Sequence, residues 1–466
     1  MRRLAAGAWL ALLAGCAAHA PPAPPSALRV PGEWRTEGRT ASAPTGAPLA
    51  AALAPPWWNA FGDPALGALV DAALAHNGDL RVARARVAEY RARMAAADAN
   101  RQPVLGADGG PTRARALAAS GAPYVTNVFQ AELQASYEID VWGRLGSLSV
   151  VAAASYRAER ASADAAALSI AASVASGYLN LRGLDAQLAL TEATLRLRGE
   201  SRELARKQFE VGYSSQLEWL QAQSEYYAAA ELAPQLERSI FEQENALAIL
   251  TGANPGAVAR GAPLEALTAP PVPAGLPSEL LRRRPDIARA EQNLLAQNAS
   301  LEATRDQLLP SFKLSAVGGV QASALSRFVH APTALWHATA LVAGPIFDGG
   351  RVQSQTDAAA AQRDQAAIAY ENAVRSAFAE TENGLGALHR LGQQALANDA
   401  RRAVAADTLR IARNRYRNGY ASYLEELDAQ RTLYNADLGR LQLKTRILIA
   451  SVDLYRALGG GWQAIP

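Results

Sequence analysis

The sequence contains very little of the chemistry that enzymes and metal sites use most often. Its 466 residues include one cysteine, two methionines and five histidines. A single cysteine cannot form a disulfide within the chain, and it leaves no cysteine set for a zinc site. HExxH, P-loop and GxSxG motifs do not occur. We therefore predict no catalytic residue, no metal site and no cofactor, and we expect a protein that is not an enzyme.

Strong charge of one sign is also missing. Lysine and arginine together number 46, aspartate and glutamate 43, and the formal net charge is +3. A protein that binds nucleic acid needs a concentrated basic face, which this balance does not indicate. We therefore expect no nucleic-acid partner.

Long hydrophobic runs are absent apart from a short one at the start of the chain. Met1-Arg2-Arg3 is followed by an apolar stretch over residues 4–15. About a dozen residues cannot span a bilayer as a helix, which needs about 20, and this arrangement is typical of an export signal. We interpret residues 1–15 as a signal peptide.

The only cysteine closes that apolar stretch. Leu13-Ala14-Gly15-Cys16 resembles a bacterial lipobox, which implies that Cys16 is lipidated and becomes the first residue of the mature chain. The alternative is an ordinary signal peptide that is cleaved after Ala18-His19-Ala20. Residues 16–56 are rich in Ala, Pro, Ser and Gly, and we predict that they form a lipidated tether.

An internal duplication dominates the rest of the sequence. A shift of 207 residues places Gly143-Arg144 on Gly350-Arg351, and between positions 206 and 229 it makes 11 of 24 residues identical to their partners. Such a match indicates one structural module used twice. We place the first repeat at residues 57–260 and the second at residues 261–466, each with a helix, two strands, a long helix and a return helix.

Each repeat predicts two β-strands. Residues 129–139 alternate without interruption between an apolar set (Phe129, Ala131, Leu133, Ala135, Tyr137, Ile139) and a polar set. Period two indicates a strand with one apolar face, and a tilted membrane strand needs about 9–11 residues. The second repeat keeps the phase at Trp336, Ala338, Ala340, Val342 and Ile346, and weaker strands are expected at 104–112 and 312–320. A soluble sandwich would show the same alternation.

The remaining segments predict helices. Residues 145–209 contain no proline, and as one helix they would be about 95 Å long. Leucines at coiled-coil spacing predict side-by-side packing with return helices at 217–250 and 424–458, the first of them kinked at Pro234. Shorter helices should end near Asn100 and run over 278–308, the latter interrupted at Pro285.

The number of strands in one chain limits how a membrane barrel could be assembled. Four strands cannot close a membrane barrel, because the smallest closed barrels have about eight. An open sheet edge in lipid leaves backbone groups unpaired at several kcal/mol each. If these strands cross a membrane, subunits must therefore share the barrel.

At this point the chain resembles the outer-membrane factor family of Gram-negative efflux systems, the TolC-like and NodT-like lipoproteins. The matching pieces are the lipobox, Asp63-Pro64, Asn77-x-Asp79-Leu80, the stretch from Leu276 to Asp286, GPIFDGGR from Gly344 to Arg351, Tyr416-x-x-Gly419, YLEELDAQ from Tyr423 to Gln430, and the stretch from Leu454 to Trp462. The resemblance implies a fold that is mainly α with a small β part, completed in a homotrimer as a 12-stranded β-barrel and an α-helical barrel.

The same resemblance implies a function. The protein would be the passive exit duct of a tripartite efflux system, lipid-anchored in the outer membrane with a periplasmic helical extension. Its partners would be a periplasmic adaptor (membrane fusion protein), an RND-type inner-membrane pump and outer-membrane lipid. The alternatives are a periplasmic helical scaffold lipoprotein and the exit duct of a type I protein secretion system.

The resemblance also implies a periplasmic gate at the start of the second return helix. Leu424 and Asp428, one turn apart, would form an apolar ring and a carboxylate ring in a trimer, and Glu425 matches an acidic position in some relatives. Asp428 could instead be a solvated charge near a helix start. Ala421 stands where some relatives have an arginine that ties the tips together, which puts such a latch in doubt.

Two glycine turns are the expected docking surface for the adaptor. They are Gly212-Tyr213 and Gly419-Tyr420, one after each long helix. Glycine there also serves as an ordinary helix cap, and the two roles are compatible.

Overall fold

The computed structural model describes residues 28–35, 56–271, 277–460 and 462. Cys16, the predicted signal peptide and most of the predicted tether therefore lie outside the described residues. The described chain forms two compact units. A strand unit contains Arg86–Arg160 and Arg289–Glu371, and a helical unit contains the described parts of Leu28–Ala85, Ala161–Ala288 and Asn372–Pro466.

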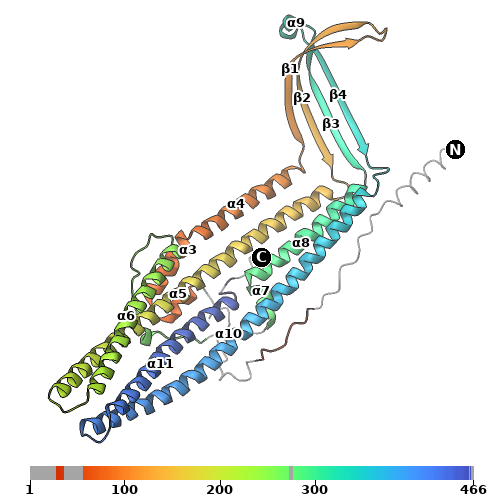
Figure 1. The fold of residues 1–466 in the computed structure, drawn as a ribbon. Helices are drawn as coiled ribbons and strands as arrows, with labels where there is room; N and C mark the ends of the chain where they lie inside the picture. Colours follow the sequence, from red (N-terminus) through yellow and green to blue (C-terminus); the bar gives the residue numbers. More distant parts are fainter. Residues whose placement is uncertain (1–27, 36–55, 272–276, 461, 463–466) are drawn as a thin grey trace. The chain divides into compact units, whose positions relative to one another are not determined.

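The strand unit holds one antiparallel sheet to which both repeats contribute (Figure 1). Its strands, in spatial order, are β1 (Val104–Leu117), β2 (Pro123–Ile139), β3 (Ser311–Ala322) and β4 (Thr333–Ala343), with the short helix α9 (Leu325–His330) between the last two. All four predicted strands are confirmed. Ile346 is a correction: it lies beyond the end of β4, because the chain leaves the sheet before Pro345.

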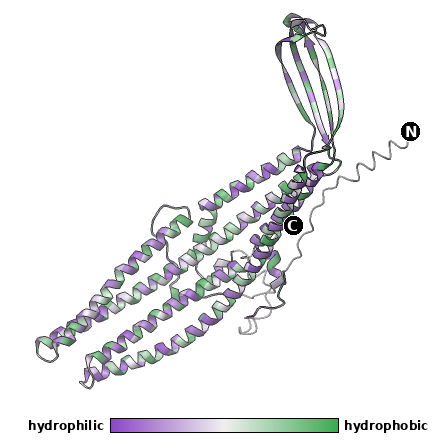
Figure 2. Ribbon diagram, turned by 45° about the vertical axis from the view of Figure 1, so that its right-hand side comes forward, coloured by the Kyte–Doolittle hydropathy of each residue, from purple (hydrophilic) through white to green (hydrophobic). Residues whose placement is uncertain are grey.

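The register brings the apolar positions of all four strands onto one face. Leu133 lies opposite Ala107 on β1 and Gly318 on β3, and Gly318 lies opposite Trp336 on β4. Residues directly opposite each other point to the same side of a sheet, so the alternation in each strand adds up to one apolar face. Figure 2 shows hydrophobic and hydrophilic residues alternating along the strands. Leu133 and Trp336 are both exposed in the single chain. In the single chain this apolar face is therefore uncovered, and it is suited to contact with lipid or with protein.

Helices make up most of the described chain, as predicted. Those of the first repeat are η2 (Trp57–Phe61), α3 (Pro64–His76), α4 (Gly78–Ala99), α5 (Arg144–Glu210) and α6 (Gln216–Leu250). Those of the second are η3 (Leu264–Ala266), η4 (Pro277–Glu279), α7 (Leu280–Arg283), α8 (Pro285–Arg305), η5 (Asp306–Leu308), α10 (Arg351–Arg417) and α11 (Tyr423–Ala457). Helix α6 continues through Pro234. None of the helices in the described part combines the length and apolar character that crossing a membrane requires.

One helix prediction was wrong. The first helix was expected to continue to about Asn100, but it breaks at Asn77 into α3 and α4. The Asn77 side chain accepts a hydrogen bond from the amide of Leu80 at 3.0 Å and donates one to the carbonyl of Leu250 at 2.9 Å. The first bond caps α4 and the second ties the break to the end of α6.

The second repeat reproduces this joint with different chemistry. Arg284 lies 207 residues after Asn77, at the break between α7 and α8, and it donates to the carbonyl of Ala457 at 3.0 Å. Helices α6 and α11 are also followed alike, each by a glycine two residues beyond its last residue, Gly252 and Gly459. A Cβ at either glycine would collide with a backbone carbonyl, that of His76 or of Arg283. The duplication therefore extends from the sequence to the packing of the helical unit.

Candidate functional site

The turns after α5 and α10 have the same geometry. Gly212 and Gly419 adopt φ values of 76° and 75°, the left-handed conformation that favours glycine. The amide of Tyr213 bonds the carbonyl of Gln208 at 2.8 Å, and that of Tyr420 bonds the carbonyl of Arg415 at 2.8 Å. Both turns are thus Schellman motifs. They leave Tyr213 79% exposed and Tyr420 78% exposed, at the positions predicted for adaptor docking.

Helix α11 begins with one buried and one exposed face. Tyr423 and Leu427 are buried in a small cluster with Ala205 and Ala222. Leu424, Glu425 and Asp428 are exposed. Leu424 and Asp428 are four residues apart on one helix, so they share a face. The structure therefore places the three predicted gate residues together at an exposed helix start, and any ring needs further copies of the chain.

The first repeat presents a different surface at the same place. Leu217 and Glu218 stand where the second repeat has Leu424 and Glu425, but Gln221 replaces Asp428. Only α11 therefore supplies a carboxylate one turn after the exposed leucine.

An ionic cluster near the starts of α6 and α11 was not predicted from the sequence. The carboxylate of Glu225 on α6 forms ion pairs with two arginines. Its Oε2 lies 3.2 Å from Nη2 of Arg198 on α5, and its Oε1 lies 3.1 Å from Nε of Arg431 on α11. Arg198 also donates to the backbone carbonyl of Glu225 at 2.9 Å. The hydrogen bond to Glu225 raises the pKa of Arg431 above its usual value. One carboxylate thus joins three helices and both repeats.

In this cluster the arginine of α11 is paired within its own chain, which concerns the ionic latch that the sequence left in doubt. Ala421 carries no charge, and Arg431, on the same helix as Asp428, points its guanidinium to Glu225 within the same chain. Glu225 and Arg431 are 206 residues apart, so no local pattern could have revealed the pair.

Two tyrosines lie on either side of the second glycine turn, Tyr416 near the end of α10 and Tyr423 at the start of α11. The hydroxyl of Tyr416 donates to Gln208 Oε1 at 3.3 Å, and its ring packs on that of Tyr423 with centroids 5.6 Å apart. Burial raises the pKa of both Tyr416 and Tyr423 to about 12. Both hydroxyls therefore stay neutral at any physiological pH.

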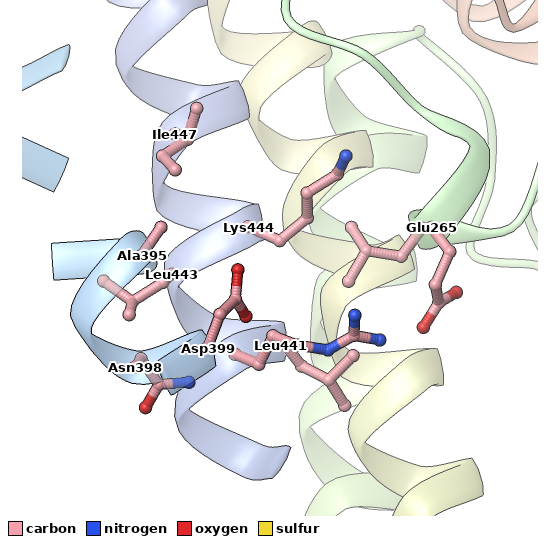
Figure 3. A pocket seen from close by; sticks show the side chains of 10 residues that line it. Glu265, Ala395, Asn398, Asp399, Leu441, Leu443, Lys444 and Ile447 are labelled. Atoms are coloured by element: carbon pink, nitrogen blue, oxygen red, sulfur yellow. The ribbon is translucent and has the colours of Figure 1, made fainter. Parts of the chain in front are cut away.

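A cavity of about 240 Å³ lies between α10, α11 and η3 (Figure 3). Its charged lining residues are Glu265, Asp399, Arg440 and Lys444, and its apolar ones include Leu441 and Ile447. The described residues contain no group of three or more His, Cys, Asp or Glu side chains that could hold a metal ion. The first repeat has Ala233 and Glu237 in place of the two cations, so this cavity is not a repeated feature.

Comparison with known proteins gives a consistent result. A family model described as outer membrane efflux protein matches residues 69–253 and 276–460, two ranges offset by the same 207 residues as the internal repeat. The antibiotic efflux pump outer membrane protein ArpC of Pseudomonas putida is 34% identical over 460 residues, which are 97% of this chain and 94% of ArpC.

Two further proteins extend the comparison. The cation efflux system protein CusC of Escherichia coli O6:H1 is 33% identical over 409 residues, 87% of this chain and 88% of CusC. The open state of the MtrE outer membrane channel of Neisseria gonorrhoeae superposes with a TM-score of 0.84 at 30% identity, over 95% of this chain and 98% of MtrE.

Proposed function

This chain belongs to the outer membrane efflux protein family, and from that premise we propose that it acts as a homotrimer in a tripartite efflux system. It is an outer-membrane exit duct for efflux. In the trimer, β4 of each copy pairs with β1 of the next, and twelve strands enclose an aqueous passage. The RND-type inner-membrane pump supplies the energy, and the solute passes from it through the periplasmic adaptor into the duct.

The observation that carries this proposal is the apolar sheet face with its open edges. Within the described residues, β1 and β4 each have one edge without a partner strand. Unpaired strand edges are costly in lipid, and pairing between copies removes them. A periplasmic scaffold would need neither the apolar face nor the open edges.

The gate is assigned to Leu424, Asp428 and Glu425. Three copies of an exposed leucine around an axis narrow the passage with apolar side chains, and three aspartates favour cations. The turns at Gly212-Tyr213 and Gly419-Tyr420 remain free for the adaptor, because their tyrosines project into solvent. Cys16 carries the lipid anchor, so Cys16→Ala weakens membrane retention and leaves the trimer intact.

The transported solute is set elsewhere in the assembly. ArpC and CusC share about a third of their residues with this chain, yet one is named for antibiotics and the other for cations. A duct of one fold therefore serves chemically different cargoes, and selection belongs to the pump.

Single-channel conductance in planar bilayers tests the proposal. Purified protein should form cation-preferring pores of low open probability. Asp428→Ala should reduce the cation preference, and Leu424→Ser should raise the open probability. Gln221→Ala, at the equivalent place in the first repeat, is the matched control and should change neither. Stable trimers that never conduct, even with Leu424 and Asp428 both replaced, contradict the proposal.

A further inference from the structure

The hairpin of β1 and β2 extends further than the rest of the sheet. The last row that three strands share is Pro111, Phe129 and Ala322, because Ala322 ends β3. Beyond that row, residues 112–117 of β1 pair only with residues 123–128 of β2. Six residues of strand are about 20 Å long. This projecting hairpin, residues 112–117 and 123–128, lies at the end of the sheet away from α5 and α10 (Figure 1).

The apolar face of β1 changes its chemistry where the projecting hairpin begins. The β1 residues on this face below the hairpin are uncharged: Leu105, Ala107, Gly109 and Pro111. The next two positions in the same phase are Arg113 and Arg115, whose partners on β2 are Asn127 and Val125. Alternate residues of a strand point to the same side. Both arginines therefore stand on the face of the sheet that carries Leu133.

The change coincides with the expected edge of the hydrocarbon layer. Ten residues separate Ile139 from Phe129 along β2, which is about 34 Å of strand. At the usual tilt of membrane strands this length covers about 25 Å of membrane, the height of the apolar band of outer-membrane barrels. Phe129 therefore lies at one boundary of that band, and Arg113 and Arg115 lie just outside it on the lipid-facing side.

Charge at this end of the sheet has one sign. Residues 112–128, which contain the projecting hairpin, and residues 321–333, which connect β3 to β4, include no aspartate or glutamate. Their basic residues are Arg113, Arg115, Arg327 and His330. Arg113 and Arg115 are exposed, and neither guanidinium has a hydrogen-bond or ion-pair partner in the part of the chain that the structure describes. Their positive charge is therefore uncompensated by the protein.

The opposite end of the sheet is different, because its cations meet carboxylates of the same chain. Arg144 pairs with Glu138 at 2.6 Å, and Lys313 lies directly opposite Glu138 in the register of β2 and β3. The arginine pair is also not a product of the duplication, since its counterparts in the second repeat are Val320 and Ala322. Each chain thus carries one unpaired arginine pair, at one end of its sheet.

We propose that Arg113 and Arg115 bind the phosphate groups of an anionic lipid in the outer leaflet of the outer membrane. The long helices continue from the other end of the sheet into the periplasmic part of the channel, so the projecting hairpin faces the outside. A guanidinium matches phosphate oxygens with two parallel hydrogen bonds. The apolar face beside the pair contacts the acyl chains of the same lipid. This inference rests on the proposed function, because only insertion of the sheet brings the pair to lipid.

The opposite face of the hairpin explains why the ligand is a lipid and not a solute in the duct. The alternate phase of β1 carries Thr112, Ala114 and Ala116, which continue the face of the sheet that lines the passage. An anionic solute that leaves the duct passes these uncharged residues. The arginines stand on the other side, where phosphate groups are held in place by the membrane.

Native mass spectrometry of the full-length trimer in detergent tests the proposal. The probe is bis-phosphorylated lipid A, and the comparison is the same glycolipid without its phosphates. Arg113→Gln combined with Arg115→Gln should weaken binding of the phosphorylated lipid about 25-fold, because each arginine near an anionic surface contributes a factor of about five. Binding of the phosphate-free lipid should not change. Added salt should weaken only the phosphate-dependent part.

A charge-shifted variant is the matched control. Arg113→Gln and Arg115→Gln combined with Ala114→Arg and Ala116→Arg keep the net charge of the hairpin and move it to the opposite face. This variant should bind the phosphorylated lipid as weakly as the double variant. Inorganic phosphate in large molar excess should not displace the lipid from wild-type protein, because it lacks the acyl chains that the apolar face holds.

Each contrary result has a distinct meaning. Conducting trimers that bind both forms of the lipid equally overturn the inference and leave the proposed function standing. Recovery of binding in the charge-shifted variant shows that net charge acts without regard to the face, which also overturns it. Displacement by inorganic phosphate reveals a site for a free anion instead of a lipid. Wild-type protein that forms no conducting trimer defeats the proposed function and this inference with it.

Discussion

Replacing Glu225 by alanine should weaken the junction between the two repeats more than any exposed charge substitution on α6. The carboxylate is 9% exposed and bonds Arg198, whose side chain is 10% exposed, and Arg431, whose side chain is 50% exposed. The substitution removes a buried anion and leaves Arg198 buried without its ionic partner.

The magnitude follows from the burial of each partner. Removing one member of a buried ion pair costs about 3–5 kcal/mol. Arg431 is half in solvent and loses at most about 1 kcal/mol. Arg198 keeps its hydrogen bond to the backbone carbonyl of residue 225, so the low end of the range, about 3 kcal/mol, is expected for Glu225→Ala.

Urea unfolding followed by circular dichroism measures the effect. Glu231→Ala on the exposed side of the same helix is the control and should stay within about 0.5 kcal/mol of wild type. Replacing Arg198 and Glu225 together by methionine and leucine should recover most of the loss, because no unpaired charge remains. If Glu225→Ala unfolds at the same urea concentration as Glu231→Ala, the ionic cluster does not contribute to the free energy of unfolding and the reasoning fails.

Three further predictions follow from the sheet, a helix end and the tip. Leu133→Arg on the apolar face should destabilise the inserted protein by about 2–4 kcal/mol, whereas Gln134→Arg on the polar face should insert normally in a liposome folding assay. Gly459→Ala places a Cβ against a carbonyl at a φ of 92° and should lower the melting temperature more than Gly212→Ala does. The Cβ of Gly212→Ala meets no neighbouring atom and has only the left-handed strain of about 1–2 kcal/mol. Equal shifts of the melting temperature would show that the structure relaxes around the collision. The pKa of Tyr423 is raised from 10.0 to about 12, so the stability it contributes is full below pH 10 and is lost as pH rises toward 12. Tyr423→Phe should therefore flatten the alkaline part of a stability–pH curve, and an unchanged curve would rule this tyrosine out as its source.

Patterns in the sequence predicted the four strands and the long and return helices, but not the short helices η2, η3 and α9. The alternation in 129–139 and the proline-free stretch 145–209 needed only neighbouring residues to be read, because side-chain period and backbone conformation are coupled locally. The 207-residue repeat was found by comparing the sequence with itself. The break at Asn77 was missed, although the bond from the Leu80 amide to the Asn77 side chain is a local helix cap; the second bond of Asn77, to the carbonyl of Leu250, joins residues 173 apart and leaves no local signal. The positions of the gate and turn residues came from motifs, and the structure placed them on exposed surfaces at the expected helix ends.

The tertiary structure decided what depends on partners far apart in the chain. The pairing of β2 with β3 joins the repeats and merges four amphipathic strands into one apolar face. Glu225 and Leu220 show the same dependence. Nothing near either residue says that one is buried between two arginines while the other is exposed. Burial depends on which surface lies opposite. Two sequence-equivalent leucines differ here because the described part of the chain buries Leu427 in a cluster with Ala205 of α5 and leaves Leu220 exposed.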